Sequence, residues 1–285
     1  MAFLASMLMG CEKTLVAETD GGTPAEQQGN LKVSIFQLEQ MPFSQFTRSE
    51  AGELVTCLNF AVYDMDGNRL NKVNQKKGDS DFGSAGFQLA EGNYQLVALA
   101  HSSNGNPTMT DPAKIQFTNS QGYTDTFLYY SKVTIGQEPQ TLSLSLRRIT
   151  SLCRFIINDE IPEGVEGMEF YYQGGSGHFN AATGFGVTKS KQDVSFGVET
   201  GQRQAQFDLY TFLHDSQGTI HLKVTAYGEN KSKLLEREFD VPMEQNKITR
   251  ISGDFFSGAT LASSQSITTT TTLDGVWGGE QVLTY

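Results

Sequence analysis

Apolar and polar residues alternate most regularly around the middle of the chain, within residues 141–158. Leu142, Leu144 and Leu146 alternate with Thr and Ser residues, which is the period of a strand with one buried face. A second apolar run, residues 152–157, follows without a loop-forming Gly or Pro. The pattern therefore predicts two strands in close succession.

Two basic residues, Arg147 and Arg148, separate these runs. We interpret the first run as the last strand of one β-domain and the second as the first strand of another. The alternative is one long bent strand within a single sandwich. Charged residues at such a junction are usually solvated, so we expect both arginines to face water and assign them no chemistry.

Strand-like runs of the same kind continue along the chain. Leu31, Val33 and Ile35 share one face of a first predicted strand, Leu31–Leu38, and Asp66-Gly67 between two apolar runs predicts a hairpin. Surface loops are expected at residues 74–86, 102–112 and 174–186. The remaining predicted strands cover residues 54–64, 69–73, 87–89, 94–101, 115–117, 124–130, 133–135, 168–172, 194–198, 205–212, 219–227, 233–241 and 247–253.

These patterns predict an all-β protein with two tandem sandwiches. Long amphipathic helical patterns are missing, while 29 Gly, 19 Phe and 10 Tyr in 285 residues indicate many strands and turns. We divide the chain into a signal and flexible tether at 1–30, an N-terminal sandwich at 31–147, and a C-terminal sandwich with a terminal strand at 148–285. The formal charge of −11 and pI of about 4.8 argue against a nucleic-acid partner.

The N-terminus carries a strong local signal. The apolar residues 2–9 are too few to span a bilayer, and they end in Leu8-Met9-Gly10-Cys11 before a polar, Gly-containing tract. A small residue before a Cys is typical of a bacterial lipobox, in which the Cys thiol is acylated and the preceding peptide removed. Met9 stands where that pattern prefers a small or β-branched residue. The alternative is an ordinary apolar start with an incidental Cys.

Known catalytic and metal-binding patterns are not found. If Cys11 carries lipid, Cys57 and Cys153 remain, one in each predicted domain, and we expect two buried free cysteines. The four histidines lack metal-ligand spacing. Residues 174–178 lack the second Gly of a hydrolase elbow and a following helix. The pair Asp159-Glu160 is typical of a solvated turn. We therefore predict no enzyme activity, cofactor or metal.

Several short phrases together point to a known family. They are the lipobox with its tether, LNFAVYDMDGNRL at 58–70, LAEGNYQLVALAH at 89–101, and the Arg-Arg junction leading to CRFIINDEIP at 153–162 and MEFYY at 168–172. Over most of residues 31–285 the chain resembles fimbrial subunits of the type V pilus, the fimbrillin superfamily. Within it, the chain is most similar to the lipoprotein group of anchor and accessory subunits.

This resemblance implies two transthyretin-like sandwiches, export as a palmitate-bearing lipoprotein, and assembly with other fimbrial subunits on the outer membrane by strand exchange. It implies lipidation at Cys11, a removable first strand at Leu31–Leu38, protease cleavage after Arg48 and a C-terminal donor segment at 266–285. Anchor members keep their first strand. The donor's apolar contacts would come from Val276, Trp277, Val282, Leu283 and Tyr285.

Two other functions stay open from the sequence. The first is a surface lipoprotein that binds glycans of host or bacterial surfaces through sandwich loops, with Phe179 and Phe185 as candidate contacts. The second is a secreted enzyme, because glycosidase carboxylates can lie far apart in sequence.

Overall fold

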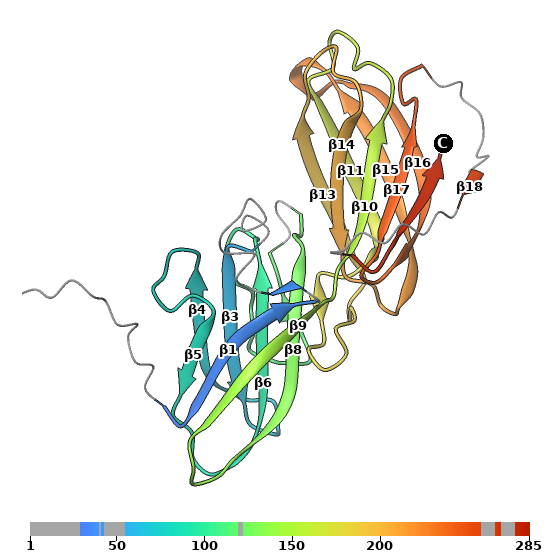
Figure 1. Ribbon diagram of the computed structural model, residues 1–285. Helices are drawn as coiled ribbons and strands as arrows, with labels where there is room; N and C mark the ends of the chain where they lie inside the picture. Colours follow the sequence, from blue (N-terminus) through green and yellow to red (C-terminus); the bar gives the residue numbers. More distant parts are fainter. Residues whose placement is uncertain (1–28, 40, 43–54, 119–121, 258–265, 269–276) are drawn as a thin grey trace, which may run out of the picture.

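A computed structural model describes residues 29–39, 41–42, 55–118, 122–257, 266–268 and 277–285. Almost all of its regular structure is β-strand, which confirms the all-β prediction. The exception among the described residues is a short 3-10 helix at Glu229–Lys231. Within this part of the chain, no helix is long and apolar enough to cross a membrane. Figure 1 shows two β-structured halves lying end to end, with β9 leading into β10 between them.

The first half contains an 8-stranded sheet in the order β2-β1-β9-β8-β6-β3-β4, with β5 also paired to β1. β1 lies between β5, antiparallel to it, and β9, parallel to it. β8 and β9 pair only at Phe127–Arg148 and Leu128–Arg147, so the sheet folds over on itself there. The strands are β1 Leu31–Leu38, β2 Met41–Pro42, β3 Cys57–Tyr63, β4 Arg69–Lys76, β5 Ser84–Phe87, β6 Gly92–His101, β8 Thr126–Ile135 and β9 Gln140–Arg148.

The second half contains a 5-stranded sheet, β14-β10-β17-β19-β18, and a 4-stranded sheet, β13-β11-β15-β16. A 2-stranded pair, β7 with β12, joins the halves. The strands are β7 Ile115–Gln116, β10 Ser151–Ile157, β11 Gly167–Gly175, β12 His178–Phe179, β13 Ser190–Gly197, β14 Ala205–Thr211, β15 Gln217–Tyr227, β16 Lys233–Glu244, β17 Ile248–Gly253, β18 Ser266–Thr268 and β19 Glu280–Thr284.

Both halves connect their main strands in the same way. In the first half β5-β1-β9 faces β4-β3-β6-β8, and in the second β14-β10-β17 faces β13-β11-β15-β16. In each half the first strand runs parallel to the last and antiparallel to its other neighbour. The second half adds β19, which runs parallel to β17 along its other edge.

Each half encloses its own hydrophobic core, and a third cluster lies between the halves. The first core draws on β1, β3, β6 and β9, and the second on β10, β11, β15 and β17. The third cluster combines the other face of β3 and β6, including Tyr63 and Leu99, with Phe179 and Phe212 of the second half. This explains why every residue of β3 is buried, since both faces of the strand are covered.

Several predictions about single elements are confirmed and others are wrong. Leu31–Leu38 is a strand with Leu31, Val33 and Ile35 buried, and the Asp66-Gly67 hairpin joins β3 to β4. Cys57 and Cys153 are both buried and free, as expected. The two strands predicted within residues 124–135 form one, β8. Loop 74–86 is shorter than expected, because β4 extends to Lys76 and β5 begins at Ser84.

Candidate functional site

The junction between the halves contains a buried arginine, so the expectation that both junction arginines face water is wrong for Arg148. Arg147 is exposed, whereas Arg148 is 1% exposed. The reason is register: β9 continues through both arginines, and Arg148 falls on the same face as the buried Leu144 and Leu146. The alternation of the sequence, extended by two residues, could have identified it.

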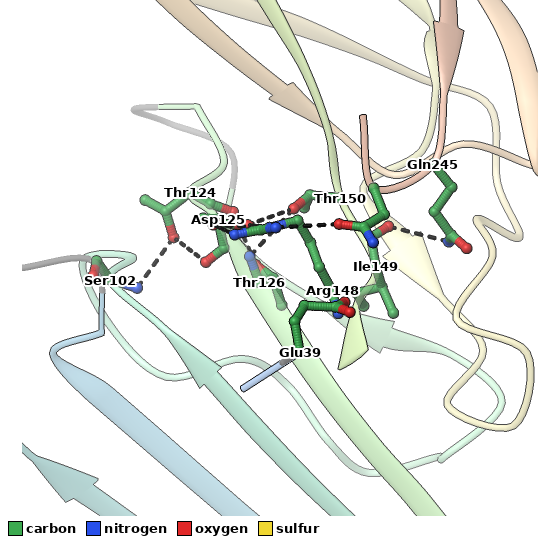
Figure 2. A network of polar contacts seen from close by, with 10 residues as sticks. Glu39, Ser102, Thr124, Asp125, Thr126, Arg148, Ile149, Thr150 and Gln245 are labelled. Carbon is green, nitrogen blue, oxygen red and sulfur yellow. Dashed lines mark hydrogen bonds and ion pairs between the residues drawn. The ribbon is translucent and has the colours of Figure 1, made fainter. Parts of the chain in front are cut away.

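Asp125 is the principal partner of Arg148 (Figure 2). Arg148 Nε donates to Asp125 Oδ1 at 2.8 Å, and Nη2 donates to Oδ2 at 2.8 Å, which makes a two-bond fork. Thr150 Oγ1 donates to the same carboxylate at 3.0 Å. Asp125 is 3% exposed, so both charges are withdrawn from water and depend on each other.

The C-terminal segment closes the other side of this arginine. The ring centroid of Trp277 lies 3.8 Å from Arg148 Cζ, and that of Phe127 lies 4.7 Å away. Arg148 Nη1 also donates to Asn246 Oδ1 at 3.1 Å, while the Asn246 carbonyl accepts from Gly278 N–H at 2.8 Å. A delocalised guanidinium stacks well on an indole face, so Arg148 helps to hold the tail.

The end of β1 reaches the same arginine. Glu39, just after β1, accepts a hydrogen bond from the backbone N–H of Arg148 through its carboxylate, and its own N–H donates to the Leu146 carbonyl at 2.7 Å. Glu39 has a φ of 50°, a conformation that non-glycine residues adopt only with support from neighbours. Arg148 therefore contacts segments from near both ends of the chain.

Further contacts fix the two halves at this point. Arg147 Nη2 donates to the Thr183 carbonyl at 2.5 Å, and Gln245 Nε2 donates to the carbonyls of Ile149 and Gly184 at 3.3 and 3.2 Å. The predicted surface loop 174–186 thus lies partly within the junction. It pairs through β12 with β7 and places Phe179 against Phe212, with ring centroids 5.0 Å apart.

Of the C-terminal residues singled out from the sequence, Val276 is outside the described residues, Trp277 lies at the junction against Arg148, and Val282, Leu283 and Tyr285 lie in the second half. β19 pairs with β17, and Leu283 is 1% exposed within the second core. The ring centroid of Tyr285 lies 5.2 Å from that of Phe155, and its hydroxyl donates to the Ile156 carbonyl at 3.2 Å. Val282 is partly buried in the same strand. Cys11 and Arg48 also fall outside the described residues.

Gly253 allows the tail to approach. A Cβ atom there would lie 2.4 Å from the Tyr285 carbonyl oxygen, so any larger residue would push the tail off β17. In this structure β19 therefore pairs with β17 of its own chain. The role of residues 266–285 as a donor to another subunit stays a prediction.

Other candidates from the sequence have structural roles. Ser176 is buried, and its hydroxyl donates to the His178 carbonyl at 2.6 Å, so it is not an exposed nucleophile. The Asp159 carboxylate accepts the backbone N–H groups of residues 255–257 in a turn. Partial burial acts to raise the pKa of Asp159, but these hydrogen bonds together lower it. Phe179 is fully buried and not available to a glycan, and Phe185 is half-buried.

No group of three or more His, Cys, Asp or Glu residues within the described part of the chain is placed to hold a metal ion. Tyr210, which lies near Trp277 with centroids 6.3 Å apart, keeps its proton at neutral pH: burial, followed by Asp125 and Asp208, raises its pKa.

Solved structures with a similar fold are found at low sequence identity. An adhesin candidate of Bacteroides ovatus matches with a TM-score of 0.50 at 15% identity, over 82% of this chain and 88% of that one. The fimbrial anchor protein Mfa2 of Porphyromonas gingivalis matches with a TM-score of 0.43 at 15% identity, over 73% and 80%. A fimbrial assembly protein of Parabacteroides distasonis matches with a TM-score of 0.41 at 12% identity, over 83% and 93%.

A search of curated proteins found no sequence match. The family model for fimbrillin-A associated anchor proteins Mfa1 and Mfa2 matches residues 45–274, which is most of the chain and spans the junction between the two halves. The expected resemblance to fimbrial anchor and accessory subunits is thereby confirmed: the chain belongs to the Mfa2 family of fimbrillin-associated anchor proteins.

Proposed function

We propose that this fimbrium-associated surface protein is a structural subunit, exported as a lipoprotein and assembled at the outer membrane by strand exchange. The observation that carries the exchange is the position of β1. It lies between β5 and β9 and contributes Leu31, Val33, Ile35 and Leu38 to the first core. A strand so placed leaves a groove when it departs.

The groove would attract another strand for two reasons. Burial of each of the four aliphatic side chains of β1 stabilises the fold by about 2 kcal/mol. Departure of the strand exposes to water the apolar core surface that these side chains covered. The facing edges of β5 and β9 would also lose their ladder partners, and unpaired edges bind added strands. A partner with apolar residues at every second position restores both contributions.

Removal of β1 from the chain would also remove its lipid anchor. We propose that Cys11 carries the lipid and that residues 12–30 lead from it to β1. A cut after Arg48 would then leave the lipid joined to the body only by the non-covalent pairing of β1. The uncut chain therefore serves as the membrane-held anchor, whereas the cut chain can release β1 and accept a strand.

The donor role of residues 266–285 has a cost in this chain. β19 pairs parallel to β17, just as β1 pairs parallel to β9, so the segment suits a parallel ladder beside the last strand of a sandwich. Donation requires the tail first to leave β17 and uncover Leu283.

We also propose that the halves are transthyretin-like domains divided at 147/148, which their shared connectivity supports.

Limited digestion tests this proposal. An arginine-specific protease should cut after Arg48 and spare Arg147, which lies in the paired end of β9, and Arg148, which is buried. The cut chain should then bind a synthetic peptide of residues 266–285 in calorimetry, and the same peptide with Leu283→Asp should bind much more weakly. Peptide binding by the uncut chain, or none by the cut chain, would contradict exchange at β1.

The lipid is tested separately by mass spectrometry of protein taken from native membranes. Cys11→Ser should abolish both the acyl mass and membrane partitioning, because the lipid is the proposed anchor.

A further inference from the structure

The ladder between β1 and β9 ends where the chain turns away at Glu39. Leu38, the last residue of β1, pairs with Leu146 of β9 on one side and with Met41 of β2 on the other. The φ of Glu39, 50°, is typical of a tight turn. The turn takes the chain off β9 two residues before β9 itself ends at Arg148.

A carboxylate takes over from the ladder at this point. The backbone N–H of Arg148 donates to the Glu39 carboxylate, which stands where a continuing strand would supply a carbonyl (Figure 2). Arg148 is 1% exposed, and a buried N–H needs an acceptor from the protein. The Glu39 N–H donates to the Leu146 carbonyl at 2.7 Å, so both backbone and side chain of Glu39 are engaged by β9.

The charges around Glu39 favour a carboxylate over a neutral acceptor. The guanidinium of Arg148 is already paired with Asp125. That of Arg147 forms no ion pair with a carboxylate in the described part of the chain. Burial lowers the pKa of Arg147, and the attraction of Glu39 opposes this shift. A hydrogen bond to an ionised acceptor is also about twice as strong as a neutral one.

We propose that the site left by β1 selects its incoming strand by an acidic side chain directly after the last buried apolar residue. This inference rests on the proposed strand exchange and defines the partner more closely. The partner is a strand of another subunit with apolar residues at the four buried positions of β1 and Asp or Glu in the place of Glu39. An additional residue, at the bulge between Ile35 and Gln37, precedes the fourth apolar position.

Calorimetry with the chain cut after Arg48 and freed of its β1 fragment tests this selection. The probe is the β1 peptide itself, residues 30–39, acetylated and amidated so that Glu39 carries its one carboxylate. Glu39→Gln in the peptide should weaken binding about fivefold, because a neutral amide oxygen replaces the carboxylate. The matched control combines Gln37→Glu with Glu39→Gln. It keeps the composition and charge of the native peptide and should bind as weakly as the single variant.

Amide hydrogen exchange in the uncut chain is a second measurement, which does not depend on strand exchange between subunits. Glu39→Gln should speed the exchange of β1 amides about fivefold, because the contact with Arg148 that closes the end of the strand is weakened. Glu91→Gln removes the same charge from an exposed position before β6 and should leave those rates unchanged.

Full-strength binding of the control peptide would show that charge acts without regard to position, and it would overturn the proposal. Unchanged β1 amide exchange in the Glu39→Gln chain would overturn it as well. Binding of no peptide at all would instead contradict the proposed strand exchange, and with it the incoming partner.

Discussion

Arg148 contributes to stability through a charge that has no access to water. Its carboxylate partner, its Asn246 acceptor and two aromatic rings replace the solvent that it loses. Removing one member of such a pair leaves the other buried and unpaired, which costs far more than the pair itself contributes.

Arg148→Met should therefore lower the free energy of unfolding by about 3–5 kcal/mol. Arg69→Gln, at an exposed position of β4, should cost less than about 1 kcal/mol and serves as the control. Denaturant titration measures both. Replacing Asp125 together with Arg148 by apolar residues should recover part of the loss; a double variant as unstable as the sum of the singles would contradict the ion-pair explanation.

His101 makes stability depend on pH. Its Nδ1 accepts from Ser103 N–H at 3.0 Å, so its Nε2–H donates to Asn59 Oδ1 at 2.7 Å. Burial, with a smaller effect of Lys72, lowers the pKa of His101 from 6.5 to about 4. The unfolded chain binds the proton more readily, so this contribution is complete above about pH 6.5 and is lost as the pH falls to about 4.

We expect wild type to lose on the order of 3 kcal/mol across that window through His101. His101→Gln should flatten the slope of unfolding free energy against pH, whatever its effect on the absolute value. An unaltered slope in the His101 variant would show that other groups set the pH dependence.

At the scale of elements, β1 and β19 each pair in parallel with a neighbouring strand, but they differ in the length of the strand on their other side. β1 is held on both sides, whereas β19 has β17 on one side and the short β18 on the other. Both ends meet Arg148, β1 through Glu39 and the tail through Trp277. The departure of β1 therefore removes a contact from the backbone of Arg148, and the departure of the tail removes a contact from its side chain.

The tail's role in its own chain can be measured directly. Leu283→Ala should cost about 2–5 kcal/mol, because it empties a fully buried site in the second core. Thr284→Ala, its exposed neighbour, should stay within about 0.5 kcal/mol. Deleting residues 280–285 should destabilise the monomer strongly. A monomer whose melting temperature survives that deletion would show instead that the tail is free for donation.

Period-two patterns allowed most strands to be predicted from sequence, including β1 and the β3–β4 hairpin. They could not predict β12, because His178 and Phe179 form a strand only through their pairing with β7, a partner more than sixty residues away. The junction site was missed for a different reason. Charge suggested solvent for Arg148 while the alternation of β9 placed it inside, and the partner that decides between them, Asp125, lies in another segment.

At the scale of the whole molecule, two β-structured halves of equal connectivity arise without a detectable sequence repeat. Connectivity depends on the order and pairing of strands, which many sequences satisfy if their apolar faces match. The contacts between halves are specific: Phe117, Phe179 and Phe212 lie within 5.0–6.3 Å of one another by ring centroids. These rings make the halves depend on each other.

We expect the two halves to unfold in one transition. Phe212→Ala should remove about 3–5 kcal/mol and separate the melting curve into two steps, because it breaks the central contact of the third cluster. Phe36→Ala, 63% exposed on β1, is the control and should leave a single step. Calorimetry distinguishes the cases, and two transitions already present in wild type would contradict the expectation.

Trp277 is the chain's one tryptophan, and it stands against Arg148, whose backbone also contacts Glu39 just after β1. Indole emission consequently reports on a single place in this protein, with no label and no competing fluorophore of its kind. A guanidinium at 3.8 Å from the ring and a tyrosine beside it set that emission in the docked state. Undocking of the tail would expose the ring to water and shift the emission to longer wavelength. Stopped-flow fluorescence could thus time the order in which the two strands depart.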